Sequence, residues 1–242
     1  MTNSIFIGND DVISYGRTSG YGLQYNDIIL KYLKAYFGVS TGTLPDLWAK
    51  WREEGHSSLE SHSNKALRSQ EIENASWTKV QMVAVVAGAN AAPDGTTTAE
   101  KIIPNTTAGV QHRLDQTTVS GAGTNCFSVY GKPSSYVYIG MRINAVGVSF
   151  NLSTGEVAVV DPGITNYGIE AVGNGWYRCY LTTVATANAI IRININDNLS
   201  AIAPNYAGDG TNGTLIWGAQ YEVGRNTPTA YIPTSAAIVT RP

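Results

Sequence analysis

The sequence contains few charged residues and very little cysteine. Charged side chains make up 14% of the 242 residues, well below the roughly 25% typical of globular domains. The 16 basic residues stand against 18 acidic ones, which is not the basic excess of a nucleic-acid-binding protein, so we expect no nucleic-acid partner. The two cysteines, Cys126 and Cys179, form neither a zinc-ligand spacing nor a CxxC motif. We expect both to be buried free thiols.

Long apolar runs and a secretory leader are also missing. No stretch reaches the roughly 18 consecutive apolar residues of a membrane helix. The first residues, MTNSIFIGNDD, lack the basic and apolar regions of a signal peptide. We therefore expect no membrane partner and synthesis in a cytoplasm.

What the sequence does contain is typical of a turn-rich β protein. It has 25 glycines, and aromatic residues make up 10% of the chain. From about residue 72, apolar and polar residues alternate with the period of a β-strand. The clearest predicted strands are 125–132, 135–144, 146–152, 155–160, 176–183, 189–196 and 214–223. Many short strands separated by glycine-containing turns favour a mainly β fold with a C-terminal β-sandwich, and argue against a parallel α/β sheet.

The N-terminal part has a different texture. Residues 1–25 are rich in Gly, Ser and Asn, show no helical period, and are predicted to form an extended arm. Residues 26–71 contain three short segments with helical spacing, the second of which carries Trp48 and Trp51. Helices this short are marginal alone, so we expect an anchoring segment with both tryptophans in its core or at an interface. The sandwich is predicted to span 72–242.

Strand alternation sorts the side chains between two faces of the predicted sheets. The outward set is rich in tyrosine, arginine and asparagine, and includes Tyr136, Tyr138, Arg142, Arg178, Tyr180, Arg192 and Asn194. Planar rings suit sugar faces and forked polar groups reach sugar hydroxyls, so one interpretation is a glycan-binding face. Tyrosine and arginine are also enriched in protein interfaces. A subunit interface and an ordinary solvated surface therefore stay open as alternatives.

Catalytic and metal-binding motifs are scarce in the sequence. A glycosidase needs two carboxylates roughly 5–10 Å apart in one cleft, whereas acidic residues such as Glu100 and Glu222 fall mostly in apparent turn contexts. None of the three histidines stands beside a nucleophile motif. We therefore predict a protein that is not an enzyme, with no catalytic residues, metal ligands or cofactor. Turns such as GDGTNG (208–213) could offer oxygen ligands to calcium, and the sequence does not decide whether they do.

Six separated segments follow one familiar pattern in order. They are NASWTKVQ (74–81), NAAPDGTTTAEKI (90–102), CFSVYGK (126–132), FNLSTGEV (150–157), VGNGWYRCYLT (172–182) and the stretch 208–234 that begins with GDGTNG. Over residues 70–242 the chain resembles the carbohydrate-binding-module-like jelly-roll domain of tailed-bacteriophage fibre and virion structural proteins. The helical segment resembles the short repeats of small phage virion proteins.

This resemblance implies a jelly-roll β-sandwich in a bacteriophage virion structural protein without enzymatic activity. Such a chain would be a head fibre, decoration or tail fibre component, anchored through its N-terminal region and made in the host cytoplasm. Its expected partners are other virion proteins of the capsid or tail and two further copies of itself in a homotrimer. The alternative implied role is a receptor-binding adhesin that recognises host surface glycans.

Overall fold

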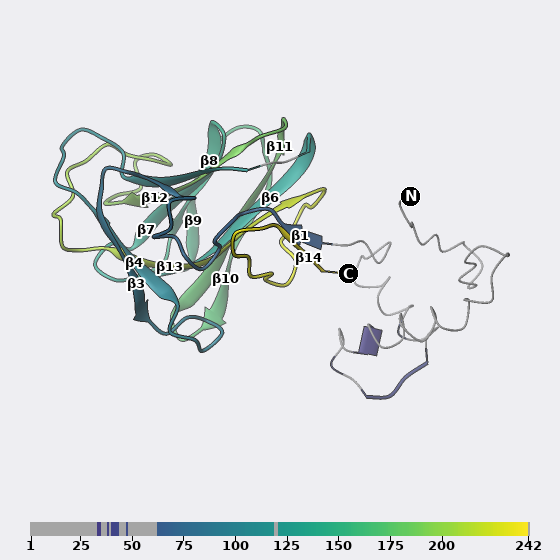
Figure 1. Ribbon diagram of the computed structural model, residues 1–242. Helices are drawn as coiled ribbons and strands as arrows, with labels where there is room; N and C mark the ends of the chain where they lie inside the picture. Colours follow the sequence, from purple (N-terminus) through teal and green to yellow (C-terminus); the bar gives the residue numbers. More distant parts are fainter. Residues whose placement is uncertain are drawn as a thin grey trace. The chain divides into compact units, whose positions relative to one another are not determined.

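The computed structural model describes residues 62–118 and 121–241, and before them only Leu33, Lys34, Gly38, residues 40–43 and Leu47. The chain divides into one compact unit of residues 1–61 with Pro242 and a second of residues 62–241 (Figure 1). The predicted arm, and Trp48 and Trp51 of the predicted anchoring segment, lie outside the described residues. Among the described residues, no helix is long and apolar enough to span a membrane.

The second unit is a β structure almost throughout. Its strands are β1 (His62–Asn64), β2 (Thr78–Val80), β3 (Met82–Asn90), β4 (Ala99–Pro104), β5 (Arg113–Thr117), β6 (Gly123–Lys132), β7 (Tyr138–Ile143), β8 (Val146–Asn151), β9 (Glu156–Val160), β10 (Ile164–Gly173), β11 (Trp176–Ala185), β12 (Ile190–Asn196), β13 (Thr214–Val223) and β14 (Val239–Arg241). The seven strands predicted from alternation all appear, with ends shifted by three residues at most.

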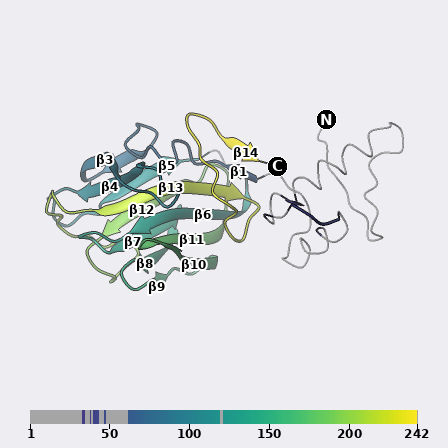
Figure 2. The same cartoon turned by 90° about the horizontal axis from the view of Figure 1, so that it is seen from below.

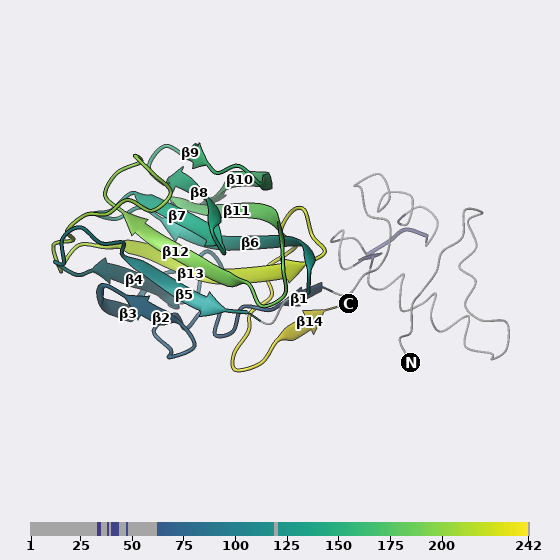
Figure 3. The same cartoon turned by 90° about the horizontal axis from the view of Figure 1, so that it is seen from above.

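Two six-stranded sheets form the body of this unit. Sheet 1 has the order β10-β11-β6-β13-β4-β3, and sheet 2 has the order β2-β5-β12-β7-β8-β9. The strand pairs within each sheet are antiparallel. Figure 3 shows the strands of sheet 2 running across those of sheet 1. This arrangement confirms the predicted jelly-roll-like β-sandwich.

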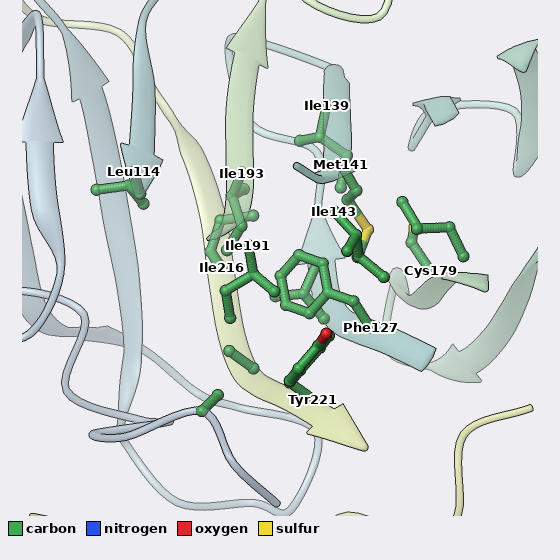
Figure 4. Packing of buried hydrophobic residues seen from close by; sticks show 14 of the residues in the cluster. Leu114, Phe127, Ile139, Met141, Ile143, Cys179, Ile191, Ile193, Ile216 and Tyr221 are labelled. Atoms are coloured by element: carbon green, nitrogen blue, oxygen red, sulfur yellow. The ribbon is translucent and has the colours of Figure 1, made fainter. Parts of the chain in front are cut away.

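The hydrophobic core lies between the two sheets because alternate side chains of each strand point inward. Figure 4 shows side chains from both sheets meeting there: Phe127, Cys179, Ile216 and Tyr221 from sheet 1, and Leu114, Ile139, Met141, Ile143, Ile191 and Ile193 from sheet 2. Each is at most 1% exposed. Burying a side chain of this size contributes about 1.5–3 kcal/mol, so the inner faces dominate the stability of the sandwich. Cys126 and Cys179 are buried and free, as predicted.

The third predicted helical segment, residues 58–70, is not helical over residues 62–70, which the structure describes. His62–Asn64 forms β1 and pairs with β14 instead, at one end of the sandwich (Figure 2). The buried Asn64 side chain explains the difference, because its amide bonds the backbone of distant residues. It donates to the carbonyl oxygens of Ala219 and Ile232 at 2.9 and 2.8 Å and accepts from the N–H groups of Ala66 and Tyr221. Such side-chain bonds compete with helix formation.

A β-bulge in β13 changes one predicted face. Strict alternation along β13 would place Trp217 on the same face as Ala219 and Tyr221, but the pairing with β6 shifts between Trp217 and Gln220. Gly218 adopts a positive φ of 64° there, which glycine tolerates without strain. Trp217 therefore points outward on sheet 1, whereas Ala219 and Tyr221 face the core.

The segment 197–206 crosses the outer face of sheet 2. The carbonyl oxygen of Ile202 accepts a hydrogen bond from Asn196 Nδ2 at 3.0 Å, and Ile202 is 2% exposed. The segment lies so close to β7 that a Cβ atom at Gly140 would come within 1.8 Å of this oxygen. Gly140 is thus the position that lets the segment lie flat on the sheet.

We expect Gly140→Ala to destabilise the protein by about 1–3 kcal/mol, the usual cost of overpacking, because the segment 197–206 must move away. Urea denaturation monitored by tryptophan fluorescence measures this loss. The matched control is Gly121→Ala, where the added Cβ meets only an ordinary contact at 3.5 Å with Val223. Equal stability of the two variants would contradict the close packing of the segment on β7.

Candidate functional site

Three arginines lie together on the outer face of sheet 2. Arg192 of β12 pairs directly with Arg142 of β7 on one side and with Asp115 of β5 on the other. Two residues along β12, Asn194 pairs with Arg113 of β5. Because neighbouring strands are about 4.7–4.9 Å apart, these side chains form one patch. We call Arg113, Arg142, Arg192 and Asn194 the arginine cluster.

Carboxylates neutralise only part of this cluster. Arg113 donates from Nε to both oxygens of Asp115 at 3.1 Å. Arg192 lies 3.6 Å from the same carboxylate and also donates to the carbonyl oxygen of Asn144. Asp115 is therefore shared between two guanidinium groups.

The side chain of Arg142 makes no hydrogen bond or ion pair with any described residue. Its Nε is buried without a partner. Burial lowers the pKa of the Arg142 guanidinium; the negative charge of Asp161 opposes this, and the positive charges of Arg192 and Arg113 add to it. One oxygen of Asp161 is itself engaged by the N–H of Gly147 at 2.9 Å.

Asn194 also carries unsatisfied polar atoms, as does Arg192, whose Nε has no hydrogen-bond partner. Asn194 is 1% exposed, and neither its Oδ1 nor its Nδ2 has a hydrogen-bond partner. A buried amide without partners costs about 1–3 kcal/mol, so most proteins avoid one. Arg142, Arg192 and Asn194 therefore carry buried hydrogen-bonding atoms that no described residue satisfies.

The predicted outward set is divided by the structure. Tyr138, Arg142, Arg192 and Asn194 lie on the outer side of sheet 2, as the alternation predicted. Tyr136 precedes β7 and packs against the main core, with its ring centroid 5.9 Å from that of Tyr206. The expectation that Tyr136 faces outward beside Tyr138 was therefore wrong, because the strand begins only at Tyr138.

Arg178 and Tyr180 lie on the opposite sheet, so the predicted single face that joins Arg178 to Arg142 does not exist. Both belong to β11 of sheet 1 and are 8% and 9% exposed. Arg178 donates to Ser128 Oγ at 3.1 Å, and its guanidinium carbon lies 5.2 Å from the centroid of the Tyr130 ring. These contacts hold the Arg178 guanidinium against β6, although its Nε is buried without a hydrogen-bond partner.

An aromatic cluster also lies on the outer side of sheet 1. It comprises Tyr130, Trp176, Trp217 and the half-buried Tyr231. The Trp217 and Tyr231 ring centroids are 4.5 Å apart. The indole N–H groups of Trp176 and Trp217 donate to Ala91 O at 3.2 Å and Thr98 Oγ1 at 2.9 Å. The two indoles thus bond the segment 91–98, which lies over this side of the sheet. Because the rings are largely buried, they have little surface left for a sugar.

Arg113 and Asp115 were missed by the sequence analysis. Their strand, RLDQT, has only five residues and only one large apolar side chain, Leu114. Alternation over so short a stretch gives no reliable signal. The only hint was the repeated opposite charge at Arg113 and Asp115, a spacing that places two side chains on the same face of a strand.

A buried carboxyl group lies on the inner side of sheet 1. Glu100 of β4 is 2% exposed. Burial, followed by the hydrogen bond and negative charge of Glu73, raises the pKa of Glu100 to about 9. The Glu100 carboxyl is therefore protonated at neutral pH. Lys79 of β2 donates to the carbonyl oxygens of Glu73 and Asn74 at 2.6 and 2.5 Å and so holds the segment that carries Glu73 against the start of β2.

Two other features have less chemistry to offer. An open hollow of about 490 Å³ is lined by Ile143, Asn144, Ala145, Val146, Gly163, Thr183, Val184 and Ala185, and none of these carries a charge. In the turn 208–213, the N–H groups of Asn212 and Thr211 bond Asp209 and lower its pKa to about 2. Oδ1 of Asp209, one of the oxygens that could bind calcium, thus already accepts hydrogen bonds from two N–H groups of the turn.

No protein-family model matches the chain, and the comparison with curated proteins finds no match. Among solved structures, the chain is similar to one described as the enzymatically active domain of tailspike protein 4 of bacteriophage CBA120. The two share 15% sequence identity with a TM-score of 0.36, over 65% of this chain and 21% of that chain. A likeness this distant transfers no activity, substrate or partner. It also shows no counterpart of the predicted N-terminal repeats.

The prediction that the protein is not an enzyme was wrong, because it excluded enzymatic activity. The phage structure that the chain resembles is itself described as enzymatically active, and one fold hosts many functions. The argument from turn contexts also fails, because Glu100 and Glu222 lie buried within β4 and β13.

We expect Glu100→Gln to stabilise the protein more at pH 8 than at pH 5. Folded Glu100 keeps its proton up to about pH 9, whereas the unfolded side chain loses it near pH 4.3. Wild-type stability therefore falls as pH rises through this window, and glutamine removes that loss. Thermal unfolding at both pH values measures the difference. The matched control, Glu156→Gln on exposed β9, should show no comparable pH-dependent gain; an equal gain there would contradict the role of Glu100.

Proposed function

We propose that the chain is a structural component of a bacteriophage virion: a head fibre, decoration or tail fibre protein whose N-terminal region anchors it and whose sandwich is displayed. The observation that carries this proposal is the pairing of β1 with β14. Through it, both ends of the described sandwich leave from the same end of the unit (Figure 2). A domain tethered at one end leaves its opposite end free for contact with the surroundings.

The order of the six sequence segments supports the same proposal, since each maps to a structural feature of the sandwich. Trp176 begins β11 after a tight turn in which Asn174 and Gly175 both have positive φ. Gln220 and Glu222 on β13 hold the covering segment, because Glu222 accepts from the N–H of Thr229 at 2.9 Å and Gln220 accepts from that of Ile232 at 2.7 Å. These motif residues therefore maintain the fold rather than bind a ligand.

The second candidate function is a receptor-binding adhesin. The arginine cluster favours it, because Arg142 and Asn194 have polar groups with no partner among the described residues. Surface contact with a host glycan would use such groups. The two functions are compatible, since a fibre can both build the particle and bind the host.

If the chain is a virion component, it will be present in purified particles at a fixed copy number. We expect quantitative mass spectrometry of density-purified phage to find its peptides at a constant ratio to the major capsid protein. Antibody labelling in electron microscopy should then place it on the head or the tail. Particles that lack the chain while the infected-cell lysate contains it would contradict the proposal.

We also expect the free protein to be a homotrimer, as its resemblance to phage fibre proteins implies. Light scattering coupled to gel filtration should give three times the chain mass of 25.8 kDa. A monomer at all micromolar concentrations would contradict this expectation. Replacing both Trp48 and Trp51 by Ala tests the anchoring segment, because the trimer should weaken if these side chains lie at the interface.

A further inference from the structure

The arginine cluster places more positive than negative charge on one part of sheet 2. Like charges directly opposite each other on neighbouring strands destabilise a sheet, yet Arg142 and Arg192 are such a pair. Asp115 pairs with Arg113 and Arg192, and the charge of Asp161 acts on Arg142 without a direct ion pair. Three guanidinium groups thus stand against two carboxylates. Of the three, Arg142 has no ion pair with a described residue.

The buried amide of Asn194 lies two residues along β12 from Arg192, which pairs with Arg142. Its two polar atoms, and the Nε atoms of Arg142 and Arg192, are buried without hydrogen-bond partners. Buried polar atoms in native proteins are almost always bonded, so an orphaned set indicates a bound ion, ligand group or water. Amide and guanidinium groups both donate through N–H, which matches an acceptor with several oxygens.

We propose that the arginine cluster is an oxyanion-binding site, which takes a carboxylate, sulfate or phosphate group through Arg142 with Asn194 as a second donor. The planar guanidinium fork binds such groups with two parallel hydrogen bonds. The bound anion also offsets the repulsion between Arg142 and Arg192. This site goes beyond the proposed virion role, because it does not depend on where the chain sits in the particle. Its chemistry fits an acidic surface polysaccharide or a free inorganic anion.

Calorimetric titration of the full-length protein in low-chloride buffer separates these sources. The probes are a glucuronic-acid-containing tetrasaccharide, its neutral glucose-containing counterpart, and inorganic phosphate. We expect at least one of the two anionic probes to bind and the neutral one not to bind. If only the tetrasaccharide binds, the source is an acidic glycan; equal binding of phosphate assigns the site to a free anion.

The decisive variant is Arg142→Gln, which should weaken anion binding about tenfold or more through loss of a charge-assisted hydrogen bond. Arg142→Lys keeps the charge but loses the fork, so it should retain part of the affinity. Without anion, Arg142→Gln should melt at the same or a higher temperature than wild type, because it removes like-charge repulsion; this separates lost binding from misfolding.

The matched control is Arg68→Gln, which removes an arginine that is already paired with Glu71 at 2.6 Å. It should leave anion binding unchanged. The proposal is overturned if no anionic probe binds, if the neutral tetrasaccharide binds as tightly as the acidic one, or if Arg142→Gln retains wild-type affinity. Each of these results would leave the virion location, which is measured on particles, unaffected.

Discussion

Burial of every second side chain between the two sheets is the constraint on which the other features of the sandwich depend. Once Ile191 and Ile193 of β12 and Met141 of β7 face the core, Arg192 and Arg142 must face outward, since the side-chain period of a strand is two. A slip of one residue would bury both arginines without partners, at a cost far beyond the marginal stability of a domain. The register that builds the core therefore also builds the arginine cluster.

The two outer faces are covered in different ways. On sheet 1, aromatic rings such as Trp217 and Tyr231 pack closely together, and their polar atoms bond the covering segments or Ser69. On sheet 2, the segment 197–206 contacts the sheet through Ile202, over Gly140. Beneath the covering of sheet 1, Nε of Arg178 lacks a hydrogen-bond partner, whereas sheet 2 has several such atoms together: both polar atoms of Asn194 and the Nε atoms of Arg142 and Arg192. Such a group of buried unpartnered atoms calls for an explanation, and a bound ion or water is one.

Much of the sandwich could be predicted from the sequence, because long strands with regular alternation carry a strong signal. β6, β11 and β13 were found in this way. β10 was missed because its pattern is broken by the polar and glycine residues of ITNYGIEAVG, and much of it is exposed. The bulge at Gly218 could not be predicted, since a glycine in a strand signals a bulge without giving its phase. The pairing of strands from distant parts of the sequence could not be predicted either, and that pairing decides which outward residues share a sheet.

Arg142 and Arg178 show why the candidate site needed the structure. Both are arginines on predicted strands, both have the outward phase, and the sequence gives them equal weight. Arg178 pairs with Tyr130 of β6 across sheet 1, so it finds an aromatic face and the Ser128 hydroxyl within reach. Arg142 pairs with Arg192 on one side and Gly147 on the other, so its neighbours supply a second positive charge and no side chain. The same residue type thus bonds a hydroxyl and an aromatic face in one sheet, and in the other its side chain has no hydrogen-bond partner among the described residues. The cross-strand neighbour makes the difference.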